Sequence, residues 1–309
     1  MRIVVFGPER RVGAQTDDRV VDLNAADPSL PATLEAFIQA GPAALDRARQ
    51  AVEGASGSAV QPLGSTQLRA PAVHRPRIAC AGGNYAVHFA GAQAARTGTE
   101  VDPAEVYREV RSGPPWGFWK VAELRGPGED VAYPGRAELF DYEGELAVVI
   151  GSPAKDVPEN RVGEHIWGVT LLNDWSIRND MGPGRVLNFN LPKNFDGSTS
   201  LGPCIVAGED VDVQDVLVEV RVNGEVRQSY SSEDMIFSFA ELISYLSRDF
   251  TFQPGDLVAA GTGPGTAMDA TRPAADGSTP TDLFLGVGDV VEVSSPAIGS
   301  LQNRIVAKT

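Results

Sequence analysis

The chain has 309 residues, and its 41 Asp and Glu exceed its 26 Lys and Arg, which gives a formal net charge of −15. That length fits one large domain, or one domain with a small companion. The negative charge argues against binding to nucleic acid or to anionic membranes, although a bound metal ion can still attract a small anionic substrate. The two cysteines, Cys80 and Cys204, lie in apolar sequence and cannot build a disulfide framework. Because we recognise no signal peptide and no apolar run long enough to span a membrane, we expect a cytoplasmic protein.

The N-terminal part of the sequence predicts a small α/β lobe. Residues 2–6 and 19–23 are short β-rich runs separated by glycine and polar residues, and we expect them to pair as a hairpin. Residues 33–53 place apolar side chains at helical spacing around a Gly-Pro break, which predicts one or two short helices. A stretch rich in Gly and Ser follows, so we predict a small domain at 1–70 and a catalytic domain at 71–309.

The rest of the chain predicts mainly strands, punctuated by glycine and proline. Two helical stretches stand out, at about 92–111 and about 233–248. Since the strands do not alternate with long helices, a doubly wound parallel sheet is disfavoured, and we expect an α+β fold in which β-structure predominates. The clearest predicted strands are 77–81, 140–150, 166–172, 203–207, 216–222, 256–260 and 289–294.

An acidic strand carries the strongest functional signal. Side chains alternate along a strand, so Asp141, Glu143 and Glu145 should share one face at the mouth of an apolar strand. Like charges placed so closely repel each other, and a divalent cation would relieve this. The alternative is an exposed sheet face on which the acids are simply solvated. A second apolar strand, within 168–180, ends at Asp174, and a third carboxylate there would complete an open Mg²⁺ site.

Seven separated blocks, in order, resemble the fumarylacetoacetate hydrolase family. The resemblance implies a mixed β-sandwich roll, usually found as a homodimer, and the small N-terminal α/β lobe resembles the family's leading domain more weakly. The blocks are AGGNYAVHFAG (81–91), GFWK followed by GPGED (117–130), DYEGELAVVIG (141–151), NDWSIR (173–178), KNFDGSTSLGP (193–203), QPGDLVAAGTG (253–263) and GVGDVVEVSSPAIGSLQNRIV (286–306).

The resemblance assigns roles to the polar residues of these blocks. The family's metal motif falls on Glu143, Glu145 and Asp174, which would hold Mg²⁺, with Mn²⁺ and Ca²⁺ as credible substitutes. The family's site lysine falls on Lys193, which would stabilise enolate or carboxylate oxygen. The catalytic histidine of the N-Y-x-x-H block falls on His88. The alternatives are a surface salt-bridge lysine and a structural histidine.

Three further residues are expected to contact substrate. Thr262 matches the family's substrate-contacting threonine, and the neighbouring Gly261 lies in a glycine-rich turn whose backbone N–H groups can approach an anion. Arg178 matches the arginine of a family run. Loop closure alone is the alternative for the glycine-rich turn.

Some positions depart from the family pattern. Many hydrolytic members carry Glu three residues after the histidine, where this chain has Gly91, and Asn179 and Met181 stand where Asp and Gln are usual. The loop at 269–283 is also longer and less regular than expected. An acid from the segment 92–111 could replace the missing one if that segment closes as a lid. The candidates are Glu100, Glu105 and Glu109.

These residues predict a Mg²⁺-dependent hydrolase that cleaves a C–C bond in a small 2-oxo acid, such as an acylpyruvate or a related 1,3-dicarbonyl. The substrate would chelate the metal, Lys193 would stabilise the enolate, and His88 would activate water or move a proton. Because Gly91 replaces the usual acid, a lyase or isomerase that decarboxylates, dehydrates or isomerises a 2-oxo acid is the alternative. A third hypothesis is a metal-binding scaffold without activity, which failure to turn over a broad panel of 2-oxo acids would favour.

Overall fold

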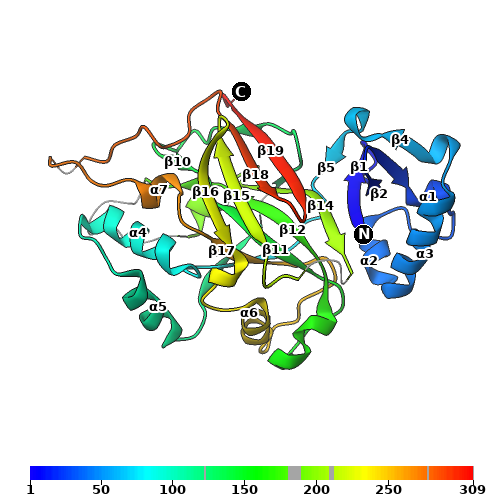
Figure 1. The fold of residues 1–309 in the computed structure, drawn as a ribbon, viewed down its shortest axis with the longest axis horizontal. Helices are drawn as coiled ribbons and strands as arrows, with labels where there is room; N and C mark the ends of the chain where they lie inside the picture. The colour runs from blue at the N-terminus through cyan, green and yellow to red at the C-terminus, as the bar shows by residue number, and fades with distance from the viewer. Residues whose placement is uncertain (122, 180–188, 209–211, 277, 309) are drawn as a thin grey trace.

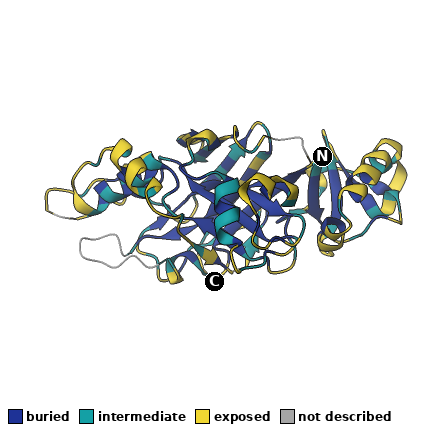
Figure 2. Ribbon diagram, turned by 90° about the horizontal axis from the view of Figure 1, so that it is seen from below, coloured by how far each residue is buried: buried dark blue, intermediate teal, exposed yellow. Residues whose placement is uncertain are grey.

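The chain folds around two packed β-sheets with short helices at the periphery (Figure 1). The computed structural model describes residues 1–121, 123–179, 189–208, 212–276 and 278–308. Strands dominate, which confirms the predicted α+β class. The strands at the centre are buried, and exposed helices and loops lie towards both ends (Figure 2).

The larger sheet has 12 strands in the described part of the chain. Its central strands are apolar and buried along almost their whole length, as expected of strands covered on both faces. In path order the strands are β4 (Val60–Pro62), β3 (Arg19–Asp22), β2 (Arg11–Thr16), β1 (Arg2–Phe6), β14 (Thr199–Ala207), β12 (Ile166–Asp174), β11 (Gly144–Ile150), β17 (Leu257–Thr262), β6 (Ile78–Ala81) and β7 (Gly117–Lys120), with β5 (Leu68–Arg69) beside β1 and β8 (Leu124–Arg125) beside β14.

A five-stranded sheet packs on the centre of the larger one. Valines of both sheets, among them Val148 and Val293, belong to one apolar core. The sheets are closely packed at Gly144, where an added Cβ would lie 2.3 Å from Val220 and 3.1 Å from Val293, so this position requires glycine. The strands are β16 (Glu225–Ser231), β15 (Leu217–Val222), β18 (Val290–Ser295), β19 (Gly299–Val306) and β9 (Val131–Ala132), and a separate ribbon pairs β10 (Phe140–Asp141) with β13 (Ser176–Ile177).

The helices are short, and several of them have clear caps. One helix ends at Gly98, whose φ of 71° gives the left-handed cap that favours glycine. Another is preceded by Ser238, which forms a capping box with Glu241. The helices are α1 (Leu23–Ala26), α2 (Leu34–Gln39), α3 (Pro42–Gly54), α4 (Ala86–Thr97), α5 (Pro103–Arg111), α6 (Phe239–Leu246) and α7 (Ala267–Ala270), and 3-10 turns occur at Gly57–Ala59, Leu63–Ser65, Glu159–His165, Leu191–Lys193 and Ser232–Asp234.

The prediction that residues 2–6 and 19–23 pair with each other as a hairpin is wrong. Residues 2–6 and 19–22 are strands, but β1 pairs with β2, and β3 pairs with the other edge of β2. The sequence of β2, RVGAQT, has too few apolar residues to stand out as a strand. The one or two short helices predicted within 33–53 are two, α2 and α3. Since β1 also pairs with β14, the lobe extends the larger sheet, and the boundary near residue 70 stays a prediction.

Three other predicted elements differ in extent. The helix predicted from residue 92 already begins at Ala86, so it includes His88, and it is separated from α5 as Pro103 indicates. The helix predicted at 233–248 is shortened, because the Ser238 capping box starts α6 there. The predicted strand 140–150 is interrupted between β10 and β11.

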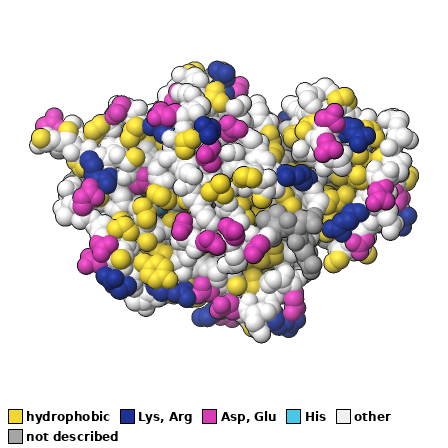
Figure 3. All heavy atoms as spheres, in the orientation of Figure 1, with side chains coloured by type: hydrophobic (Ala, Val, Ile, Leu, Met, Phe, Trp, Pro, Cys, Tyr) yellow, Lys and Arg dark blue, Asp and Glu magenta, His cyan; other side chains and the backbone are white. Residues whose placement is uncertain are grey.

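The surface carries charges of both signs. On the face seen in Figure 3, acidic and basic side chains are interspersed over the sheets. Within the residues described, no helix is both long enough and apolar enough to cross a membrane. Cys80 and Cys204 are free thiols and are buried, as their apolar sequence surroundings predict.

Candidate metal centre and its pocket

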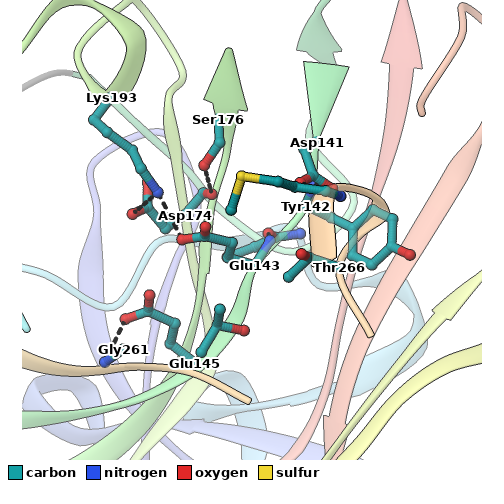
Figure 4. Close-up of polar contacts among 12 residues, drawn as sticks. Asp141, Tyr142, Glu143, Glu145, Asp174, Ser176, Lys193, Gly261 and Thr266 are labelled. Carbon is teal, nitrogen blue, oxygen red and sulfur yellow. Dashed lines mark hydrogen bonds and ion pairs between the residues drawn. The ribbon is translucent and has the colours of Figure 1, made fainter. Parts of the chain in front are cut away.

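Three carboxylates meet where β11 and β12 lie side by side. Antiparallel pairing sets Gly144 opposite Asn173, and the Asp174 amide donates to the Glu143 carbonyl at 2.8 Å. Because residues two apart on a strand share a face, Glu143 and Glu145 both project beside Asp174. One oxygen of each lies within 4.8 Å of the other two, and all three residues are buried (Figure 4). The predicted trio of acids is therefore brought together.

Two buried lysines neutralise part of this charge. Lys193 Nζ donates to Glu143 Oε2 at 2.6 Å and to Asp174 Oδ2 at 2.8 Å (Figure 4). Lys120 Nζ donates to Asp174 Oδ1 and, at 2.6 Å, to the backbone carbonyl of Lys193. Although burial opposes it, the charges of Asp174 and Glu143 raise the pKa of Lys193 above its ordinary value. Lys193 is therefore cationic at neutral pH.

Arg178 holds two acids in place. Its Nε donates to Asp141 Oδ2 at 3.0 Å, and a second nitrogen donates to Glu143. Asp141 also accepts the amides of Ala267 and Met268, at 2.8 and 3.2 Å. Asp141 thus anchors the start of α7 and stands outside the carboxylate trio. A direct contact of Arg178 with substrate stays a prediction, since its N–H groups serve these two acids.

The trio fits a hard divalent cation. Burial, together with the negative charges of Asp174 and Glu143, raises the pKa of Glu145 well above its ordinary range. A cation stabilises the charged form of carboxylates that are buried close together, and Mg²⁺, Mn²⁺ and Ca²⁺ all prefer oxygen ligands. These residues could hold a divalent ion, while the choice of Mg²⁺ stays a prediction.

A β-bulge aims the glycine-rich turn at this site. The pairing of β11 with β17 shifts register between Glu145 and Ala147, and bulges commonly re-aim groups beside active sites. Gly261 has a φ of 83°, and its N–H donates to Glu145 Oε2 at 3.2 Å (Figure 4). Thr262 Oγ1 donates to the Gly144 carbonyl at 2.8 Å. Both predicted contact residues line the pocket, yet each already has a protein partner.

His88 has an acidic partner that the sequence does not indicate. Its Nδ1 lies 2.7 Å from Oδ2 of Asp269 on α7, and both side chains are buried. Asp269 is fixed in turn by the amide of Gly265, at 3.0 and 3.1 Å from its two oxygens. The candidate acids from the helical segment lie elsewhere. Glu100 pairs with Arg272, and the other two are exposed on α5, namely Glu105 and Glu109.

A pocket of about 90 Å³ opens onto the acids. Glu143, Glu145 and Lys193 line it, together with His88. The rest of its wall is mostly aromatic and apolar, with Gln93 and Arg96 of α4 as polar residues. Gly82 makes room for this wall, because a Cβ there would lie 2.3 Å from the Trp116 ring. The apolar wall residues are Phe89, Ala92, Trp116, Phe118, Phe189 and Met268.

Sequence reasoning missed two residues of the site. Lys120 is the last residue of the GFWK block, whose resemblance to the family is its only sequence signal. Asp269 opens a loop that we described only as irregular, and no local pattern marks it. Asn179 lies outside the site, where its side chain bonds the Glu138 amide and the Arg136 carbonyl. Met181 lies outside the described residues.

The fold and a pocket with three acids that could hold a metal ion are the features to be matched, and comparison with known proteins identifies the family. The family model of the fumarylacetoacetate hydrolase C-terminal domain matches residues 77–306. The chain belongs to the fumarylacetoacetate hydrolase family, which confirms the resemblance of the seven blocks.

Individual relatives are similar over nearly the whole chain. A human protein named oxaloacetate tautomerase FAHD2B, mitochondrial, is 32% identical, over 99% of this chain and 92% of its own length. Oxaloacetate tautomerase YisK of Bacillus subtilis is 33% identical, over 94% of this chain and 93% of its own. The solved fumarylacetoacetate hydrolase of Exiguobacterium antarcticum superposes with a TM-score of 0.76 at 26% identity, covering both chains completely. Because the human relative is named mitochondrial, a cytoplasmic location stays a prediction.

Proposed function

We propose that this chain is a divalent-metal-dependent tautomerase that interconverts the keto and enol forms of a small 2-oxo diacid such as oxaloacetate. The observation that carries the proposal is one pocket that holds both a buried carboxylate trio and the His88–Asp269 pair. Relatives named as oxaloacetate tautomerases, similar over more than nine-tenths of the chain, support it. We therefore favour the isomerase alternative of the sequence analysis over the hydrolase.

The charges of the site suit an anionic substrate. Four buried acids, Asp141 and the trio, face three buried cations, Lys120, Lys193 and Arg178. Asp269 beside His88 is a fifth buried acid, and a divalent cation held by Glu143, Glu145 and Asp174 would offset the negative excess of the site. An acidic protein can therefore attract an acidic substrate to this pocket.

The chain's own residues can move the proton. A carboxylate can only accept a hydrogen bond, so His88 Nδ1–H donates to Asp269, and the opposite nitrogen, Nε2, is left as a base. Nε2 would take a proton from the carbon next to the 2-oxo group, and the imidazolium would then give up that proton, directly or through water, to the oxygen of that group to form the enol. Asp269 would stabilise the imidazolium formed meanwhile. The ammonium of Lys193 would stabilise the negative charge that develops on the oxygen. When bound, the metal supplies a Lewis acid that polarises the 2-oxo group.

Arg96 gives the pocket a place for a second carboxylate. It lies two helical turns beyond His88 on α4, about 12 Å along the helix axis. Both residues line the same pocket, so a substrate bound beside His88 can extend towards Arg96. Apart from Lys193 and Arg178, which already pair with acids, Arg96 is the arginine or lysine among the described lining residues, so a diacid with one carboxylate at the trio would direct the other to Arg96.

The test follows the ultraviolet absorbance of the oxaloacetate enol after the protein has been freed of metal with a chelator and reloaded with Mg²⁺ or Mn²⁺. The proposal expects faster keto–enol equilibration in the reloaded protein than in the chelated protein or in metal alone. Equilibration no faster than with metal alone would contradict it. Pyruvate and carbon dioxide are measured in parallel, because decarboxylation also consumes the substrate.

Hydrolysis of an acylpyruvate is the second candidate, and one observation favours it. The His88–Asp269 pair is also the arrangement that activates water for attack on a carbonyl. Water would add to the acyl carbon, the neighbouring C–C bond would break, and the enolate would take up a proton, which gives two acids. Appearance of both acids from an acylpyruvate separates this reaction from tautomerisation. Dehydration would instead release water from a hydroxy acid. The homodimer expected from the family stays a prediction.

A further inference from the structure

We propose that strand β7 is the element that positions the site lysine and one acid of the trio, with Lys120 and Asn194 as the positioning residues. The proposal rests on the proposed function only in its account of Lys193. Neither residue is part of the metal trio or touches the pocket, so both would act through the groups they hold.

Lys120 joins two parts of the site. It is the last residue of β7, and its side chain is completely buried. Its ammonium donates to Asp174 Oδ1 and to the Lys193 carbonyl, at 2.6 Å from the latter. A buried ammonium needs such partners, because an unpaired charge in the interior costs several kcal/mol. Lys120 therefore fixes the carboxylate plane of Asp174 and the backbone position of Lys193 together.

Asn194, the residue after Lys193, binds the backbone at the end of β7 through its side chain. Its Oδ1 accepts the Val121 amide at 2.9 Å, and its Nδ2 donates to the Trp119 carbonyl at 3.1 Å. These two backbone groups flank Lys120 in the sequence. The dipeptide 193–194 is thus tied to three consecutive residues of the strand end.

A third contact from β7 supports the side chain of Lys193. Phe118 lies two residues before Lys120, and residues two apart share a strand face. The Lys193 ammonium lies 5.2 Å from the centroid of the Phe118 ring, within the range of a cation–π contact. Partners of this kind commonly orient the groups that hold a metal or substrate.

Metal affinity separates orientation from charge at Lys120. If Lys120 acted only as a charge, its removal would tighten Mn²⁺ binding, because a cation near the trio repels the ion. If it orients Asp174, its removal weakens binding instead, by about tenfold or more. We therefore expect weaker Mn²⁺ binding in both Lys120→Met and Lys120→Gln, measured from the electron paramagnetic resonance signal of free Mn²⁺. Unchanged or tighter binding in the folded variants overturns this part.

A double-mutant cycle tests the action on Lys193. At saturating Mn²⁺ we expect Lys120→Met to lower kcat in the wild-type background and to have little further effect in Lys193→Met. Additive losses would overturn the link. Asn194→Ala, at a partly exposed position, should lower kcat without changing Mn²⁺ affinity. Its matched control is Asn223→Ala, which removes a similar pair of amide bonds, to Asp289 and Val290, in a distant turn. Equal kcat values for these two variants would overturn the role of Asn194.

The two arms also separate this proposal from the proposed function. If the wild-type protein does not turn over oxaloacetate, the tautomerase proposal fails, and the Mn²⁺ arm still decides whether Lys120 orients Asp174. If turnover is present but Mn²⁺ binding tightens in both Lys120 variants, the positioning role of Lys120 fails and the tautomerase proposal stands.

Discussion

Gly91 and Asp269 lie in direct contact, and Asp269 occupies the space that a side chain at position 91 would need. A Cβ added to Gly91 would lie 2.8 Å from Cβ of Asp269 and 2.9 Å from its carbonyl oxygen. The chain therefore lacks an acid at position 91 and brings one to His88 from α7. Gly91 replaces the acid that would be the usual partner of His88. The absence of a side chain at Gly91 allows Asp269 to approach His88 instead.

The pair predicts graded losses of activity. Replacing His88 with Ala removes the proposed base and should lower kcat by about 100-fold to 10,000-fold. Asp269→Asn keeps the shape but removes the charge that stabilises the imidazolium, so its kcat should fall between wild type and His88→Ala. Steady-state kinetics on oxaloacetate enol checks this order. An Asp269→Asn variant with wild-type kcat would contradict the role of the pair.

Gly91→Ala should disturb the same pair without changing either of its members. The added methyl group collides with Asp269, and overpacking of this kind costs about 1–3 kcal/mol. We expect a lower melting temperature and a lower kcat. Gly113→Ala is the matched control, because nothing lies within 4 Å of a Cβ at Gly113. A lower melting temperature with an unchanged kcat would contradict this expectation, because it would show that the His88–Asp269 contact persists when the added methyl group displaces Asp269.

The trio predicts a sharp dependence of metal affinity on each acid. Glu145→Gln and Asp174→Asn each remove one anionic ligand, and their Mn²⁺ affinity should fall by more than the roughly 10–100-fold typical of residues that only support a ligand. Titration calorimetry measures this directly. Glu164→Gln, an exposed surface acid paired with Arg161, should bind Mn²⁺ like wild type. Wild-type affinity in both trio variants would remove the metal assignment.

Arg96 predicts discrimination between diacids and monoacids. Since a hydrogen bond to a charged group contributes about 1.5–3 kcal/mol, Arg96→Met should raise KM for oxaloacetate roughly tenfold to a hundredfold. The inhibition constant of pyruvate, which has no second carboxylate, should change little. Equal weakening for both compounds would indicate that Arg96 supports the pocket wall and does not bind the distal carboxylate.

Local sequence patterns predicted the parts of the site that lie on single strands. Alternation placed Glu143 and Glu145 on one face, and the apolar run before Asp174 ended where a ligand was expected. The same alternation grouped Asp141 with them; it shares Arg178 with Glu143 but lies outside the trio, because the strand is interrupted between β10 and β11 and Asp141 also binds the start of α7. A periodic pattern cannot foresee such an interruption.

Contacts between distant segments could not be predicted in this way. His88 and Asp269 are 181 residues apart, and only the packing of α4 against α7 joins them. Lys120 ends a short strand, and its burial depends on the segment around Lys193, which comes 73 residues later. In contrast, the start of α6 was predictable, since Ser238 and Glu241 form the S-x-x-E capping signature that our longer helix overlooked.

The central claim is that Glu143, Glu145 and Asp174 together hold one divalent ion that faces substrate. A crystal structure of the protein soaked with Mn²⁺ and oxalate, with the anomalous signal of manganese recorded, tests it most directly. The account predicts one strong peak bound by an oxygen of each acid, with oxalate on the open side towards His88. Manganese bound at other residues, with none among the three carboxylates, would contradict it.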